Sequence, residues 1–202
     1  MPEPQTSKDR MIRVAIDLFS SKGFKGTSIR DIASALGMSI SNIYHYFGNK
    51  EGLWLAILEH SARGILDKLR QVSELDMEPL ARFKHLLETH ICLSDQHRKE
   101  GKIFFIDEEH LTPEGIRINR ELQRGILEIY INELRNLEAA GYVNCRSLTV
   151  LAFNILGVIN WQLRWYRPEG GLSLEEISKE IVSFVMHGIL RPDTQGKEPA
   201  VS

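Results

Sequence analysis

Four side chains between Ser41 and Lys50 have the types and spacing expected of a surface that binds nucleic acid. On a helix, Ser41, Tyr44 and His45 point away from the apolar side, because successive residues are about 100° apart. Hydroxyl groups donate to phosphate oxygens, and serine can also reach base edges. Lys50 would lie at the start of the next helix, where the helix dipole favours an anion rather than a cation. A phosphate shared with Lys50 would resolve that mismatch, so we expect this surface to lie against nucleic acid.

Two short helices around a tight turn are expected to position these side chains. Thr27 and Ser28 are both suitable N-caps, and apolar residues then recur at helical spacing until Gly37. Glycine there can take the left-handed conformation that ends a helix. Ser39 can cap the second helix, Ile40–Phe47. This pattern is typical of the helix-turn-helix of DNA-binding proteins.

Four segments of this region resemble the signature of the TetR family of bacterial one-component transcriptional regulators. They are TSIRDIA at 27–33, LGMS at 36–39, IYHYF at 43–47 and NKEGL at 49–53. The resemblance covers roughly residues 8–58 and implies a DNA-binding head, in which Ile40 belongs to the DNA face although its spacing also fits the edge of the core. The residues expected to contact DNA are Thr27, Ser28, Ser39, Ile40, Ser41, Asn42, Tyr44, His45, Tyr46 and Lys50.

Composition agrees with a basic head on an acidic body. The chain has 202 residues, of which 43% are hydrophobic and 26% charged, and its net charge is −2. Residues 1–50 have a net charge of +3 and residues 51–202 one of −5. Cys92 and Cys145 are far apart in sequence and are expected to be reduced thiols. The N-terminus has no apolar targeting segment and no run is long enough to span a membrane, so we expect a soluble, cytoplasmic protein.

The rest of the chain shows helical periodicity throughout and no strand pattern, which predicts an all-α fold. Helices are expected near 7–22, 49–74, 77–93, 96–109, 113–140, 146–166 and 173–189, besides the two short ones. We expect a three-helix head at 7–52, a larger helical effector-binding and dimerisation domain at 53–191, and a disordered tail at 192–202. The 49–74 helix would be the only element shared by both halves, so it should transmit any conformational change.

The last two long helices are expected to form a dimer interface. Residues 146–166 are apolar nearly all round, which indicates burial on every side. Gly157 and Gly188 would allow close approach of helices, and Val185 is expected at the interface. Two such helices from each subunit would make a four-helix interface, as the family resemblance also implies.

Residues 160–166 are the best candidate for an effector site. Their aromatic side chains either anchor the core where it meets water or form a pocket wall with polar groups for a ligand. The segment Trp161–Ser173 also resembles the C-terminal domain of TetR-type repressors of steroid and fatty-acid breakdown, which sense coenzyme A thioesters. Three arginines would then bind phosphates, unless they form a solvated helix face with Glu121 and Glu128. The candidate ligand-binding residues are Phe104, Phe105, Arg117, Arg120, Arg124, Asn160, Trp161, Arg164, Trp165 and Tyr166.

Enzyme and metal functions find little support. Asp107–His110 has no second histidine or cysteine at ligand spacing, and the common nucleotide-binding and hydrolase motifs are missing. We therefore expect no catalytic residue, metal or cofactor. The sequence predicts a homodimeric, ligand-responsive regulator, most simply a repressor, that binds a pseudo-palindromic DNA operator. The expected effector is an acyl-CoA or related apolar acid, with a multidrug or aromatic-compound sensor as the alternative. Activation in place of repression stays open.

Overall fold

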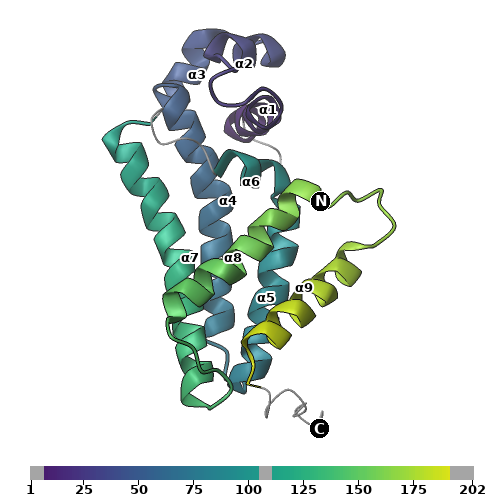
Figure 1. Cartoon of the computed structure of the whole chain (residues 1–202). Helices are drawn as coiled ribbons and strands as arrows, with labels where there is room; N and C mark the ends of the chain where they lie inside the picture. The colour runs from purple at the N-terminus through teal and green to yellow at the C-terminus, as the bar shows by residue number, and fades with distance from the viewer. Residues whose placement is uncertain (1–6, 105–110, 192–202) are drawn as a thin grey trace. The chain divides into compact units, whose positions relative to one another are not determined.

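The computed structural model describes residues 7–104 and 111–191, with side chains for 7–101 and 111–191. Within these ranges every regular element is an α-helix, as predicted (Figure 1). The helices are α1 (Ser7–Lys22), α2 (Ile29–Leu36), α3 (Ile40–Phe47), α4 (Lys50–Ser73), α5 (Pro79–Gln96), α6 (Arg98–Phe104), α7 (Pro113–Ala139), α8 (Leu148–Trp165) and α9 (Leu174–Ile189). An isolated antiparallel bridge joins Val143 to Leu190.

Two compact units account for the internal contacts. Unit 1 comprises Met1–Gly64 and His97–Leu122, and unit 2 comprises Ile65–Gln96 and Gln123–Ser202. Both α4 and α7 contribute residues to each unit. These units differ from the expected division at 7–52 and 53–191, because residues 97–122 belong to unit 1 together with the head. The expected tail at 192–202 lies outside the described residues.

Local sequence signals explain the helix-turn-helix in unit 1. Ser28 and Asp31 form the predicted capping box, with Ser28 N–H donating to the Asp31 carboxylate at 2.8 Å and Asp31 N–H donating to the Ser28 hydroxyl at 3.2 Å. Gly37 ends α2 at φ +62°, a left-handed conformation that residues with a Cβ rarely adopt. Ser39 is the N-cap of α3, but its side chain makes no capping hydrogen bond.

The core of the head is apolar and continuous. The helices α1, α2 and α3 and the first turns of α4 all contribute buried apolar residues to it. The most buried of them are Met11, Ala15, Ile32, Ile43, Leu53 and Trp54. Packing on this core fixes which side of α3 faces outward.

Unit 2 consists of the end of α4, α5, most of α7, α8 and α9. Between α5 and α7, the half-buried Arg82 and the buried Glu133 form an ion pair at 2.9 Å. On the same two helices His90 Nδ1 lies 2.8 Å from the Tyr130 hydroxyl, and both side chains are buried. Burial lowers the pKa of His90 to about 4, so this histidine is neutral at neutral pH. The helices α8 and α9 pack on α5 and on each other (Figure 1).

Helix boundaries follow the sequence signals with one revision. The helix expected over 96–109 begins at Arg98 as α6 and is described as far as Phe104, because α5 continues to Gln96. Thr112 and Pro113 begin α7, and Ser173 and Glu176 form the second predicted capping box. Both cysteines are free thiols. Within 7–104 and 111–191, no helix has the length and apolarity needed to cross a membrane.

Candidate nucleic-acid interface and effector site

The outward face of α3 carries most of the side chains predicted to contact DNA. Ile43 is only 1% exposed and anchors the helix on the head. The predicted contact residues Ser39, Ser41, Asn42, Tyr44, His45 and Tyr46 are all exposed, and Ile40 is half-buried at the edge of the core. The burial of one side of α3 therefore brings the predicted residues together on the other.

Helical geometry orders this face. At about 100° per residue, Ser41 and His45 lie opposite the buried Ile43, with Asn42 beside them. Tyr44 and Tyr46 flank this ridge on either side, and each is about half exposed. The arrangement can place small polar groups at base edges and tyrosine hydroxyls at the two flanking backbones.

Two predicted residues have intramolecular roles. The Thr27 side chain is buried, and its hydroxyl donates to the carbonyl oxygens of Gly23 at 2.9 Å and Leu18 at 3.2 Å. It is thus unavailable to DNA in this conformation and instead ties the end of α1 to the start of α2. Ser28 is exposed, but its hydroxyl is engaged by Asp31 at 2.6 Å.

Lys50 also binds within the head. Its ammonium donates to the carbonyl oxygens of Phe24 at 3.0 Å and Thr27 at 3.3 Å, and it lies 4.2 Å from the centroid of the Phe24 ring. Partial burial lowers the pKa of Lys50. An ammonium has three donors, so one remains for a phosphate oxygen. Lys50 thus connects the α1–α2 turn to the start of α4.

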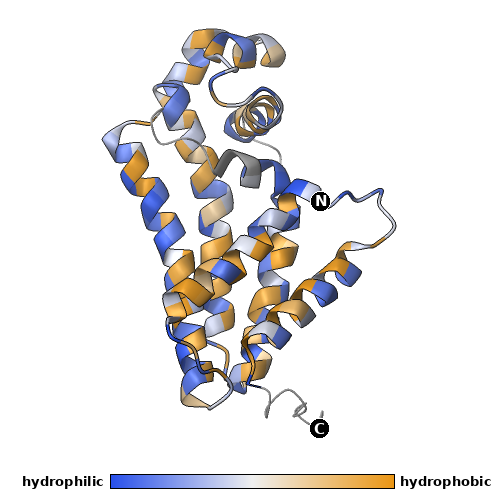
Figure 2. Ribbon diagram, viewed as in Figure 1, coloured by the Kyte–Doolittle hydropathy of each residue, from blue (hydrophilic) through white to orange (hydrophobic). Residues whose placement is uncertain are grey.

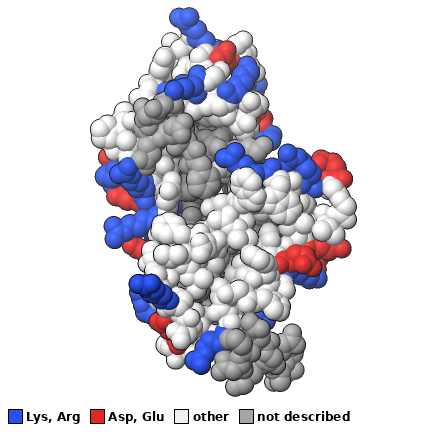
Figure 3. Space-filling model, in the orientation of Figure 1, with Lys and Arg blue, Asp and Glu red and all other residues white. Residues whose placement is uncertain are grey.

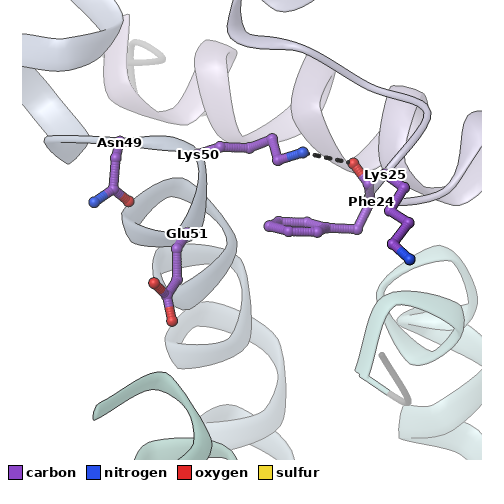
Figure 4. A pocket seen from close by; sticks show the side chains of 5 residues that line it. All are labelled: Phe24, Lys25, Asn49, Lys50 and Glu51. Carbon is purple, nitrogen blue, oxygen red and sulfur yellow. Dashed lines mark hydrogen bonds between the residues drawn. The ribbon is translucent and has the colours of Figure 1, made fainter. Parts of the chain in front are cut away.

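A hollow of about 380 Å³ lies beside this lysine (Figure 4). It is lined by Phe24, Lys25, Asn49, Lys50 and Glu51, and Figure 4 shows Glu51 pointing away from Lys50. In Figure 3 the surface formed by α1–α3 shows several lysines and arginines and few acidic side chains. This distribution fits the net positive charge of residues 1–50.

Glu51 caps a second helix. Its Oε1 accepts hydrogen bonds from the Thr112 backbone N–H at 2.8 Å and the Thr112 hydroxyl at 2.9 Å. Thr112 in turn accepts from Gly115 N–H at 3.2 Å, as the N-cap of α7. A Cβ on Gly115 would lie 2.0 Å from Glu51 Oε1, so only glycine leaves room for this carboxylate. We call Glu51, Thr112 and Gly115 the α4–α7 clasp.

The predicted effector residues at the end of α8 lie partly on its exposed face and partly on its buried face. Trp161 is 65% exposed, and Trp165 and Arg164 are also exposed. Tyr166 is buried and Asn160 is half-buried. The five residues therefore do not form one wall within the protomer.

One buried polar residue of α8 was missed. Gln162 is 0% exposed, and neither its side-chain oxygen nor its side-chain nitrogen has a hydrogen-bond partner. A pattern signal was present, because Gln162 follows Ile155 and Ile159 at helical spacing and interrupts their apolar stripe.

The predicted arginines lie along α7. Arg117 pairs with Glu114 and Glu121, both at 2.6 Å, and Arg124 pairs with Glu128 at 2.8 Å. These pairs are exposed, as the alternative of a solvated helix face had predicted. Arg120 is also exposed. The phosphate-binding role stays a prediction.

Three other predictions fall beyond the described side chains. Phe104 ends α6, but its side chain and the whole of Phe105 are not described, and Asp107–His110 also lies outside the described residues. In the part of the chain that is described, no group of three or more histidine, cysteine, aspartate or glutamate side chains could hold a metal.

Comparison with known families decides what the head and the body are. Residues 11–57 match the family described as bacterial regulatory proteins, tetR family, and residues 76–189 match the tetracyclin repressor-like C-terminal domain. The second match alone covers more than half of the chain. The chain belongs to the TetR family of transcriptional regulators.

Individual TetR relatives align over nearly the whole chain. The transcriptional repressor KstR2 of Rhodococcus jostii is 26% identical over 187 residues, 92% of each protein. The TetR regulator PfmR of Thermus thermophilus has a TM-score of 0.81 and 26% identity, covering 91% of this chain and 100% of PfmR. A structure of AibR in complex with isovaleryl coenzyme A and operator DNA has a TM-score of 0.79 and 25% identity, covering 88% of this chain and 96% of AibR.

Membership fixes the general activity. TetR proteins are DNA-binding regulators rather than enzymes. This TetR regulator is a transcriptional repressor that binds operator DNA as a homodimer and takes a small-molecule effector. The exposed face of α3 carries residue types that suit contact with DNA.

Proposed function

We propose that this protein is a cytoplasmic repressor that releases its operator when it binds an acyl-CoA or a related apolar acid. The observation that carries the DNA-binding part is the exposed polar ridge of α3, flanked by two tyrosines on a basic head. The effector class is supported by one neighbour of the same fold, AibR, whose structure contains isovaleryl coenzyme A and operator DNA.

On DNA, α3 lies in the major groove of each half-site. Ser41, Asn42 and His45 face base edges, and asparagine is well suited to adenine because it can donate and accept at once. Tyr44, Tyr46 and the third donor of Lys50 bind phosphates and fix the register. A pseudo-palindromic operator then places the two half-sites one helical turn apart, about 34–36 Å, or a multiple of that distance.

The dimer interface is formed by the outer faces of α8 and α9. Val150, Phe153 and Trp161 are exposed large apolar residues at helical spacing on α8, and Phe184 on α9 is 68% exposed. In Figure 3 the surface over α8 is largely free of charged side chains. Val185, which we expected at the interface, is only 4% exposed in the protomer and packs inward. Phe184 therefore takes its place in the proposal.

The arginines of α7 remain candidates for the phosphates of a coenzyme A nucleotide. Exposed ion pairs spaced three or four residues apart on a helix contribute only about 0.3–0.5 kcal/mol each. Arg117 and Arg124 can therefore exchange their glutamate partners for phosphate at little cost. Arginine also binds phosphate through two parallel hydrogen bonds.

The effector signal reaches the head through α4 and α7 together. Each of these helices has residues in both compact units, and the α4–α7 clasp joins their first turns within unit 1. A 100-fold preference of the effector for the released state corresponds to about 2.7 kcal/mol, enough to move a 10:1 equilibrium to roughly 1:10. By thermodynamic reciprocity, operator DNA must weaken effector binding by the same factor.

Two experiments test the proposal. Operator sequences selected from a random duplex pool should bind in a salt-dependent gel shift, and Ser41→Ala should change the selected sequence more than the total affinity, whereas Ser73→Ala on α4 should change neither. Calorimetry with isovaleryl-CoA, isovalerate and a planar cationic drug, with and without operator, tests the effector. Tight binding of the cation alone would favour a multidrug sensor, and thioester affinity that is equal with and without DNA would refute the switch.

A further inference from the structure

The inward stripe of α8 is apolar except at one position. Ile155, Ile159, Leu163 and Tyr166 are buried along this stripe, and Gln162 lies among them with 0% exposure. Figure 2 shows how much of the α8 ribbon is hydrophobic. A leucine or methionine of similar size would satisfy packing alone, so the amide at Gln162 needs another reason.

The amide of Gln162 is unsatisfied at both ends. Neither Oε1 nor Nε2 has a hydrogen-bond partner, and neither atom is accessible to solvent. Among the described side chains only Asn119 Oδ1 shares that condition. Buried polar groups are almost always paired in native proteins, because an unpaired one destabilises the fold. A buried amide without partners therefore marks a place where a partner is supplied from outside the chain.

The chemistry of the amide restricts that partner. A carboxamide offers donors on nitrogen and an acceptor on oxygen, side by side. A group that satisfies both must itself present an acceptor and a donor, as an amide, a hydroxyl or a buried water does, and an amide matches both ends side by side. An ionised carboxylate only accepts, so it would leave Oε1 unpaired and would bring a buried charge that needs a cation. The buried His90 of the same unit supplies no such cation at neutral pH, because burial holds it neutral.

We propose that Gln162 is a specificity-determining contact of the effector site and selects a ligand that buries a neutral amide rather than a bare carboxylate. This inference rests on the proposed function, in which a small molecule binds the helical body. It narrows the effector class from acids in general to molecules such as CoA thioesters, whose pantetheine arm carries two amides. Free acids of the same acyl group lack that feature.

The probes for the test are isovaleryl-N-acetylcysteamine, which carries a thioester and one amide, isovaleryl-CoA and isovalerate. We expect the wild-type protein to bind both thioesters and to bind isovalerate at least tenfold more weakly. The variant Gln162→Met removes the amide with little change in length. It should weaken isovaleryl-N-acetylcysteamine binding about 10- to 100-fold, the range expected for one paired neutral amide.

Thermal unfolding supplies an independent readout. Without ligand, Gln162→Met should raise the melting temperature by about 2–5 °C, because it removes an unpaired buried polar group. Gln123→Met, at a half-buried position of α7, is the matched control and should change neither quantity. A role in packing or in a structural network would instead lower the melting temperature of Gln162→Met.

The melting temperature and the ligand affinities test different steps of this inference. A lower melting temperature for Gln162→Met would overturn the inference, because the amide would then have partners within the fold. Unchanged thioester binding in that variant would overturn the ligand contact. Equal wild-type affinity for isovalerate and the thioesters would overturn the amide preference but leave the acyl effector class standing. If wild-type protein binds none of the three probes, both the effector class and this inference fail, whereas operator binding is judged separately by gel shift.

Discussion

Breaking the α4–α7 clasp should destabilise unit 1 in a way that depends on which member is changed. Glu51 Oε1 accepts two hydrogen bonds from Thr112 and lies at the N-terminus of a 27-residue helix. Hydrogen bonds to a charged group contribute up to about 1.5–3 kcal/mol each when buried, and a carboxylate at a helix N-terminus adds about 0.3–1 kcal/mol. Because Thr112 is exposed and Glu51 half-buried, we expect Glu51→Ala to cost about 2 kcal/mol in total.

The effect of Gly115→Ala on the free energy of unfolding is expected to have opposite signs with and without the Glu51 carboxylate. In the Glu51→Ala background, Gly115→Ala should stabilise the protein by about 1 kcal/mol, the usual gain from alanine within a helix. In the wild-type background its Cβ would meet Glu51 Oε1 at 2.0 Å and force the carboxylate out of the clasp. There the helical gain is outweighed by the lost contact, so Gly115→Ala should destabilise by about 1 kcal/mol.

Urea unfolding of the four proteins in this double-mutant cycle gives the coupling energy directly. Amide exchange at Thr112 gives a local readout, which should become about 30-fold faster in Glu51→Ala if about 2 kcal/mol of local stability is lost. Operator DNA should change the exchange rate at Thr112 in wild-type protein but not in Glu51→Ala, because the clasp joins α7 to the head. If Gly115→Ala stabilises both backgrounds equally, the carboxylate is not at Thr112 and the coupling route is wrong.

Three further predictions address the head, the dimer and the body. Lys50→Met should lower the slope of operator affinity against salt by about one unit and should also destabilise the head. The exposed Lys68→Met should do neither. An unchanged slope in Lys50→Met would mean that Lys50 makes only its contacts within the head. Phe184→Glu should convert the dimer to monomers, as measured by sedimentation at micromolar concentration. Ser183→Glu, a change at the neighbouring exposed residue, should leave the dimer intact. If Phe184→Glu is still a dimer, the interface lies elsewhere. The folded pKa of His90, about 4, lies below its unfolded value, so stability should fall as pH drops from about 6.5 towards 4, by up to about 3 kcal/mol. Urea titrations should show a smaller loss over this range in His90→Gln, and equal losses in both proteins would contradict the assignment.

Local signals made most of the helix-turn-helix predictable from the sequence. The capping box at Ser28 and the left-handed end at Gly37 depend on residues a few positions apart, so the sequence contains all the information that determines them. The exposed side of α3 followed from periodicity once Ile43 was assigned to the core. Thr27 and Lys50 behaved differently, because their partners are carbonyl groups brought near by tertiary folding. Periodicity contains no information about such partners.

The two faces of α8 and α9 could not be told apart in advance for a related reason. When apolar residues occur all round a helix, their spacing no longer identifies the side that packs inside the protomer. Val185 and Phe184 are neighbours, and only the fold shows that Val185 is buried and Phe184 is exposed. For the same reason the sequence could not show whether Trp161 faces a pocket or the outside, and its side chain is exposed in the protomer.

The division of α8 into two faces gives the proposed regulator a simple physical logic. An exposed apolar face with few charges favours burial against a second subunit, because removing that surface from water stabilises the dimer. The inward face carries Gln162, whose amide has no hydrogen-bond partner among the described residues and is proposed to be paired by a ligand. Because both faces belong to one helix, a ligand that repositions the inward side of α8 also acts on the surface proposed to hold the two subunits together. Dimer geometry and effector binding are therefore expected to be linked through α8, as operator spacing requires.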